Sequence, residues 1–191
     1  MKKILCISLV LVMMLSFAAC STNTDTNDTV SADNATPSTT EPETTTTLEA
    51  PEGFALFQDK EVAVGYPSDW TKTNDTTFTN GAATITVETQ DKTDYYSTLD
   101  TSKYVQKAKD ELQAEGKKLV TASVGKKDKD GLSVTYINRT FTVEETGNEM
   151  YENIYSFNTK NKTYIITITQ PNGLEVDKTL GDKIYETIVV K

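Results

Sequence analysis

The chain has 191 residues, a formal net charge of −9, no histidine, and two cysteines, Cys6 and Cys20. The acidic balance argues against nucleic acid as a main partner, because phosphate binding requires a basic surface. Beyond Cys20 the chain has neither a thiol nor an imidazole, which excludes a serine–histidine–aspartate triad, a cysteine–histidine pair and zinc ligation by these residues.

The first residues have the pattern of an export signal. Lys2 and Lys3 precede an apolar run from Ile4 to Phe17. This run is too short to cross a bilayer comfortably and is typical of the apolar region of a signal peptide. We therefore expect residues 1–19 to be removed from the mature protein.

The end of this signal resembles the lipobox of bacterial lipoproteins, in which small residues stand directly before a cysteine. The sequence here is Ser16-Phe17-Ala18-Ala19-Cys20, and Phe17 stands where leucine is usual. The resemblance implies cleavage after Ala19 and acylation of Cys20 with lipid chains such as palmitate. An ordinary secretory signal, cut after Ala18, is the alternative.

Residues 20–53 are predicted to form a lipid-anchored, disordered, threonine-rich tether. Between Ser21 and Gly53 there are seven acidic residues and no basic one, with a run of threonines from Thr44 to Thr47. Large apolar side chains are almost absent, so little burial could offset the entropy lost on ordering. Glycosylation of the threonines stays open.

A change of composition at Phe54 predicts a single folded domain over residues 54–191. Its first part shows the alternation of short strands, at 54–57, 62–66, around Phe78 and at 83–88. Asn80-Gly81 between the last two strands is a strong hairpin signal. These residues therefore predict four strands before the first helix.

A helix is expected next, capped by Asp100 or Thr101 and ended by Gly116. Its apolar stripe consists of Tyr104, Val105, Ala108 and Leu112. Four more strands are expected after it, beginning at 119–124 and continuing at 132–143, 150–157 and 164–168. Helical spacing of Leu180, Ile184 and Ile188 predicts a C-terminal helix.

This order of elements predicts an α+β domain. Strands linked by hairpins form an antiparallel sheet, and two amphipathic helices need apolar surfaces to cover. We expect a curved antiparallel β-sheet covered by the two main helices.

The segment Val64-Gly65-Tyr66-Pro67-Ser68-Asp69-Trp70 resembles the opening of PsbP-like domains, with an aromatic residue, proline and tryptophan. The fold group includes the extrinsic PsbP protein of photosystem II and the DcrB-like and Lpq-type lipoproteins. The resemblance implies an α/β/α sandwich over residues 54–191. It implies no shared catalytic set, since members of the group are accessory or partner-binding proteins.

Candidate contact residues are few, and no metal or cofactor site is expected. Tyr95 and Tyr96 could bind a sugar or peptide, although such a pair more often packs beneath a helix. Lysines between 103 and 129 could form a weak basic face toward anionic lipids or wall polymers, or simply be solvated. The candidates with the best claim to a surface contact are Tyr95, Tyr96, Lys117, Lys118, Lys126 and Lys127.

These observations lead to one main functional hypothesis and two alternatives. The main one is a non-catalytic binding or accessory module, lipid-anchored through Cys20 on the outer face of the cell membrane, with a protein or cell-envelope partner. One alternative is a domain that binds a small ligand in a pocket. The other is an enzyme based on carboxylates or lysine, for which no residue spacing selects a catalytic set.

Overall fold

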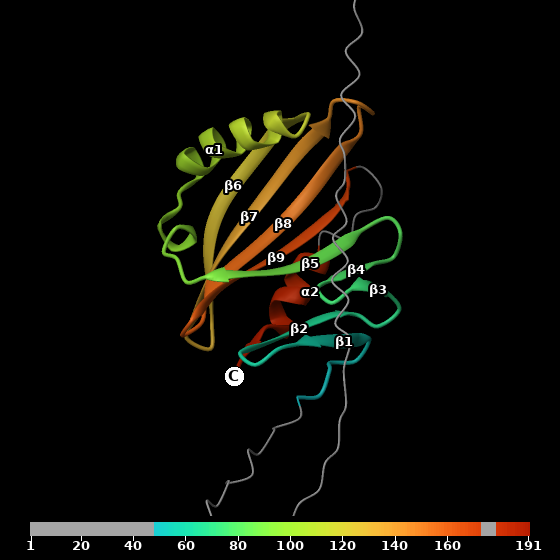
Figure 1. The fold of residues 1–191 in the computed structure, drawn as a ribbon, viewed down its shortest axis with the longest axis vertical. Helices are drawn as coiled ribbons and strands as arrows, with labels where there is room; N and C mark the ends of the chain where they lie inside the picture. Colours follow the sequence, from blue (N-terminus) through green and yellow to red (C-terminus); the bar gives the residue numbers. More distant parts are fainter. Residues whose placement is uncertain (1–47, 173–178) are drawn as a thin grey trace, which may run out of the picture. The chain divides into compact units, whose positions relative to one another are not determined.

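The computed structural model describes residues 48–172 and 179–191 (Figure 1). The strands before the first helix are β1 (Phe54–Gln58), β2 (Val62–Pro67), β3 (Thr71–Asn74), β4 (Thr77–Thr79) and β5 (Thr84–Asp91). A short 3-10 helix, η1 (Tyr96–Thr98), and the helix α1 (Thr101–Ala114) follow. The remaining elements are β6 (Lys117–Lys129), β7 (Leu132–Val143), β8 (Glu149–Asn158), β9 (Lys162–Pro171), α2 (Thr179–Thr187) and β10 (Val189–Val190).

The strands form two sheets in which every pair is antiparallel. The larger sheet has the order β3-β4-β5-β9-β8-β7-β6, and the smaller one has the order β1-β2-β10. Hairpins connect β6 through β9 one after another, whereas α1 carries the chain from β5 to the far edge at β6 (Figure 1). The predicted large antiparallel sheet and the two helices are therefore confirmed.

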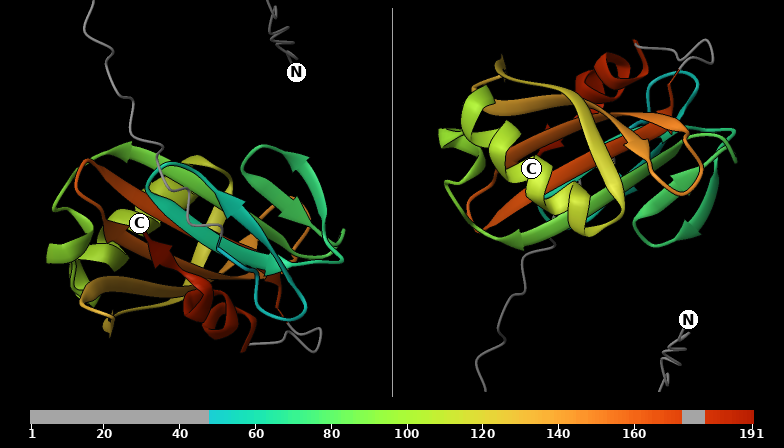
Figure 2. Two further views of the ribbon diagram at one scale, coloured as in Figure 1. Left: turned by 90° about the horizontal axis from the view of Figure 1, so that it is seen from below. Right: turned by 90° about the horizontal axis from the view of Figure 1, so that it is seen from above.

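The larger sheet separates two apolar cores, because successive side chains of a strand point to opposite faces. On β9, Tyr164 and Ile166 join a core with α2 and the β1–β2 hairpin, while Ile165 joins a core with α1. The two helices thus pack on opposite faces of the sheet (Figure 2). We call these the α2 face and the α1 face.

Local signals in the sequence account for the limits of α1. The side chain of Asp100 accepts a hydrogen bond of 2.8 Å from the amide of Lys103, which caps the first turn. Gly116 has φ of +70°, the left-handed conformation with which many helices end. Tyr104, Ala108 and Leu112 are buried on the inner side, as the apolar stripe predicts.

Three sequence predictions need correction. The strand β3 was not predicted, because Thr71–Asn74 is exposed throughout and contains no apolar residue. The final helix ends at Thr187, and the next residues include β10, which pairs with β2. The larger sheet is open, because its edge strands β3 and β6 do not pair with each other, and the expectation of a curved sheet covered by the two helices is not confirmed.

The aromatic corner that carries the PsbP-like resemblance lies at the end of β2. The ring of Tyr66 stacks on Phe78 of β4 with centroids 3.8 Å apart, and the amide of Trp70 donates to the carbonyl of Pro67 at 3.0 Å. Trp70 is half-buried and packs against the core on the α2 face. The corner therefore joins the two sheets.

The predicted signal, its cleavage after Ala19, the lipidation site Cys20 and most of the tether lie outside the described residues. Within 48–172 and 179–191, neither helix is long and apolar enough to cross a membrane.

Candidate functional site

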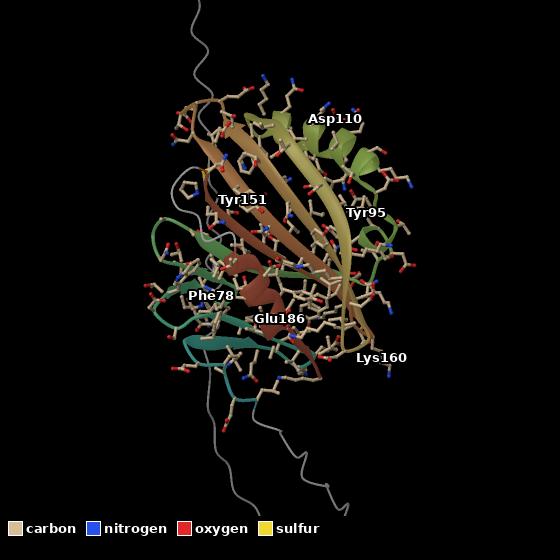
Figure 3. All side chains as sticks on the ribbon, turned by 180° about the vertical axis from the view of Figure 1, so that it is seen from behind. Phe78, Tyr95, Asp110, Tyr151, Lys160 and Glu186 are labelled. Carbon is tan, nitrogen blue, oxygen red and sulfur yellow. The ribbon has the colours of Figure 1, made fainter. Side chains whose placement is uncertain are left out.

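The two candidate tyrosines lie before α1, with Tyr96 as the first residue of η1 and Tyr95 directly before it, and they pack against the core of the α1 face. Their rings meet edge to face with centroids 5.0 Å apart, and the Nζ atom of Lys107 lies 4.1 Å from the centroid of Tyr95. Tyr95 is labelled in Figure 3. Burial raises the pKa of Tyr96. Tyr95 and Tyr96 thus contribute to packing, and each keeps part of its surface at the solvent.

The four candidate lysines are spread along β6, an edge strand of the larger sheet. The pairing register with β7 places Lys117 and Lys126 on the α1 face and Lys118 and Lys127 on the α2 face. They do not form one basic surface. Lysines on an edge strand discourage pairing with another chain, which gives their distribution a structural reason.

Two of these lysines are engaged within the domain. Lys117 forms an ion pair of 2.7 Å with Glu115 and lies over the ring of Phe141. Lys127 forms one of 2.5 Å with Asp182 of α2 and lies over the rings of two tyrosines, Tyr136 and Tyr185. Lys127 thereby holds α2 against the edge strand.

A buried ion pair occupies the middle of the α1 face. Arg139 on β7 donates to Glu152 on β8 at 2.5 Å and to the hydroxyl of Tyr104 on α1 at 3.0 Å, and Thr169 on β9 donates to Glu152 at 3.0 Å. Burial alone would lower the pKa of Arg139, but the charge of Glu152 and the hydrogen bonds raise it. Both charges are satisfied by protein groups, so the pair joins three strands to α1.

A pocket with a mixed polar and apolar lining is found at one end of the α1 face, between η1 and the turns that follow β6 and β8. Its volume is about 230 Å³. The lining residues are Asp94, Tyr96, Ser97, Gly131, Leu132, Ser133, Thr135, Ser156, Phe157 and Asn158. Four of them carry aliphatic hydroxyl groups, and Asp94 is the one carboxylate among them. We call it the hydroxyl pocket.

Most polar groups of the hydroxyl pocket have partners. Thr135 donates to the carbonyl of Tyr96 at 3.0 Å, Ser97 donates to the carbonyl of Asp94 at 2.8 Å, and Asn158 donates to the carbonyl of Thr93 at 3.0 Å. These bonds attach η1 and the segment before it to the ends of β7 and β8. The pocket is therefore a fixed part of the fold.

Ser156 is the exception. It is 1% exposed, lies directly across from Thr135 in the register of β7 and β8, and its Oγ atom has no hydrogen-bond partner within the described part of the chain. Buried hydroxyl groups are nearly always paired, because leaving one unpaired costs about 1–3 kcal/mol. Ser156 is thus the one lining residue with unused hydrogen-bonding capacity at a buried position.

The opposite face holds a second buried polar group. Asn153 donates to Asn138 at 2.7 Å and to the hydroxyl of Tyr151 at 3.0 Å. Its Oδ1 atom, and the Nε2 atom of Gln170, find no partner among the described residues. This group lies beside Gly181 of α2, where a side chain would collide with Tyr155 and Asn153.

In the described part of the chain, no general base lies within hydrogen-bond reach of the buried serine of the hydroxyl pocket. A serine nucleophile needs a general base within hydrogen-bond reach, and the Oγ atom of Ser156 has none. No group of three or more metal-ligating side chains occurs in residues 48–172 and 179–191.

The sequence predicted Tyr96 as a candidate contact residue, and the structure places it in this pocket. Thr135 and Ser156 were not predicted. No motif marks them, and they come from strands that meet only through the pairing of β7 with β8. One weak signal was present: Ser156 is the polar residue between Tyr155 and Phe157, in a strand with apolar residues on both faces.

Comparison with known proteins supports the fold. No protein family and no curated protein matches the chain. Cyanobacterial PsbP (CyanoP) from Synechocystis sp. PCC 6803 superimposes with a TM-score of 0.56 at 12% identity, over 74% of this chain and 95% of that protein. Two matches are weaker. Mog1 superimposes with a TM-score of 0.41 at 10% identity, over 68% of this chain and 90% of Mog1. Protein PA94 from Pseudomonas aeruginosa superimposes with a TM-score of 0.34 at 12% identity, over 70% of this chain and 91% of PA94. The fold is therefore PsbP-like, as the sequence resemblance implied.

Proposed function

We propose that this protein is a non-catalytic binding or accessory module on the outer face of the cell membrane, attached by lipid at Cys20. The choice of binding over catalysis rests on the hydroxyl pocket, whose buried serine, Ser156, has no general base within hydrogen-bond reach among the described residues. The two helices on opposite faces of the sheet favour the α/β/α sandwich of PsbP-like proteins. The cysteine after Ala19 and the tether-like composition of 20–53 favour membrane attachment.

The partner we propose is a protein or another component of the cell envelope. The apolar surface of the domain does not identify this partner. Among the described residues, the only exposed large apolar side chains are those of Val120, Val189 and Val190. A large apolar docking patch is therefore absent from residues 48–172 and 179–191. The second candidate function, a small-ligand-binding domain, is favoured by the hydroxyl pocket.

Replacement of Cys20 tests the attachment. Cys20→Ala should move the protein from the membrane fraction to the soluble extracytoplasmic fraction, because acyl chains on that sulfur would provide the anchor. Cys6→Ala is the matched control and should leave the protein in the membrane fraction, since Cys6 belongs to the part removed as signal. Equal partition of wild type and Cys20→Ala into detergent would contradict the lipoprotein hypothesis.

Crosslinking in intact cells tests the accessory role. The anchored wild type should form a discrete crosslinked species with an envelope component, which mass spectrometry can identify. Cys20→Ala should lose most of that species, because anchoring raises the local concentration at the membrane. Crosslinks confined to abundant cytoplasmic proteins would argue against the proposal.

A further inference from the structure

The strand β5 is longer than the strand beside it, so part of its outer edge is unpaired. β4 pairs with β5 only up to Thr86, whereas β9 pairs with β5 as far as Asp91 (Figure 1). The amide of Val87 still donates to the carbonyl of Thr76, at 2.9 Å. The ladder stops there, because the amide of Thr76 donates to the side chain of Asn74 instead. Residues 88–91 of β5 therefore have an open outer edge.

This open edge presents backbone groups to the solvent. In an antiparallel strand, the N–H and C=O groups of every second residue point to the same side. Since the amide of Val87 points outward, those of Thr89 and Asp91 do so as well, and no described residue pairs with them. All four side chains of the segment are exposed. An added strand can therefore reach these groups.

A hollow of about 560 Å³ lies along the open edge. On β5 it is lined by residues 87–90, which alternate between the two faces of the sheet. Phe57 of β1 contributes on the α2 face and Ile165 of β9 on the α1 face, and Thr76 also lines the hollow. Because its lining comes from both faces, the hollow lies in line with the sheet, where a longer β4 would continue. We call it the β5 slot.

The charges around the β5 slot restrict the kind of strand that fits. Its lining includes the carboxylates of Asp59 and Glu88 and neither lysine nor arginine. Glu88 is exposed and forms no ion pair within the described part of the chain. Asp91 adds a third carboxylate, with Lys162 opposite it on β9. A second copy of this edge, or the acidic segment before Gly53, would meet like charge, so a basic strand is favoured.

We propose that the β5 slot binds an extended segment of an envelope protein in which basic and apolar residues alternate. The segment adds to β5 in line with β4 and pairs with the backbone of Thr89 and Asp91. Its side chains alternate between the faces, which places basic residues beside Glu88 on the α1 face and apolar residues beside Phe57 on the α2 face. This inference rests on the proposed binding function and adds the class of partner to it.

Fluorescence anisotropy and hydrogen exchange would test the proposal on the full chain in a nonionic detergent. The probe is a capped, labelled peptide in which lysine and valine alternate. One matched peptide has glutamate in place of lysine, and another has every amide N-methylated so that it cannot donate to a strand. The lysine–valine peptide should bind and slow exchange at the amides of Thr89 and Asp91. Both matched peptides should bind at least about tenfold more weakly.

A charge reversal on the open edge tests the site itself. Glu88→Lys should weaken binding of the lysine–valine peptide about tenfold, because it turns an attraction into a repulsion. Glu145→Lys, in the exposed turn after β7, makes the same change of net charge and should bind like wild type. Both positions are exposed, so both variants should fold with nearly unchanged stability.

Four results would overturn the proposal. They are no binding of the lysine–valine peptide at millimolar concentration, equal binding of either matched peptide, equal binding by the two variants, and protection only outside residues 88–91. Slow exchange at Thr89 and Asp91 without peptide would also overturn it. That protection would identify a second copy if it rose with protein concentration, and a segment of the same chain if it did not. Release of Cys20→Ala from the membrane would in each case leave the proposed envelope function standing.

Discussion

Arg139 and Glu152 face each other with little water access, their side chains being 17% and 8% exposed. Glu152→Ala would leave the guanidinium buried without its counter-charge, which costs about 3–5 kcal/mol. Glu111→Ala is the matched control, because its 3.4 Å pair with Lys107 lies on the exposed side of α1. That change should cost less than about 0.5 kcal/mol. Urea unfolding, followed by the fluorescence of Trp70, would measure both.

A double replacement separates packing from charge at the same place. Arg139→Met with Glu152→Leu removes both charges and keeps most of the apolar volume, so it should recover much of the stability that Glu152→Ala loses. Equal losses in the single and double variants would mean that the hydrogen bonds to Tyr104 and Thr169, rather than the ion pair, determine the stability of this site.

The hairpin of β1 and β2 is held to β9 by one titratable pair. The hydroxyl of Tyr164 donates to Asp59 at 2.6 Å, and the amides of Glu61 and Val62 donate to the same carboxylate at 2.8 Å each. Burial alone would raise the pKa of Asp59, but these hydrogen bonds lower it below its usual value. Burial and the bond to Asp59 raise the pKa of Tyr164.

These shifts predict a stability that declines at both ends of the pH scale. A lowered carboxyl pKa stabilises the fold above the unfolded value of about 3.9, and that contribution is lost as pH falls through the lower folded value. A raised tyrosine pKa stabilises below about 10, and its contribution is lost as pH rises through the higher folded value. The measurement is the urea midpoint of unfolding as a function of pH. Asp59→Asn should reduce the fall of this midpoint at acid pH, and Tyr164→Phe should reduce its fall at alkaline pH. Asp75→Asn, at an exposed pair with Lys72, should change neither.

The elements differ in how far the sequence could predict them. The meander from β6 to β9 was predictable because its strands are long and alternate, and because Asp130-Gly131 adopts the positive φ angles of a tight hairpin. β10 was not predictable, since Ile188 stands at helical spacing after Ile184 and is buried as a helical residue would be. The hydroxyl pocket depends on η1 meeting two strands far along the chain, which no local pattern encodes.

The whole domain is closed at β2, where its two ends come together. β1 pairs with one side of β2 and β10 with the other, and the amide of Lys191 donates to the carbonyl of Glu61 at 2.8 Å. Gly65 of β2 also donates to Thr187 at the end of α2, at 2.7 Å. Both ends of the folded domain are thus held by backbone hydrogen bonds at a single strand.

Limited proteolysis tests where this closed domain begins. The sequence predicts a boundary near Phe54, but the amide of Ser68 already donates to the carbonyl of Gly53, and that of Phe54 to Pro51. Trypsin is uninformative, because no lysine or arginine lies between Lys3 and Lys60. A glutamate-specific protease should cut early after Glu41, Glu43 or Glu49 and more slowly inside the paired strands, since sites in those strands require local opening. Mass spectrometry of the fragments gives the boundary. Early cleavage after Glu61 or Glu88, inside the paired strands, would contradict a domain closed at β2.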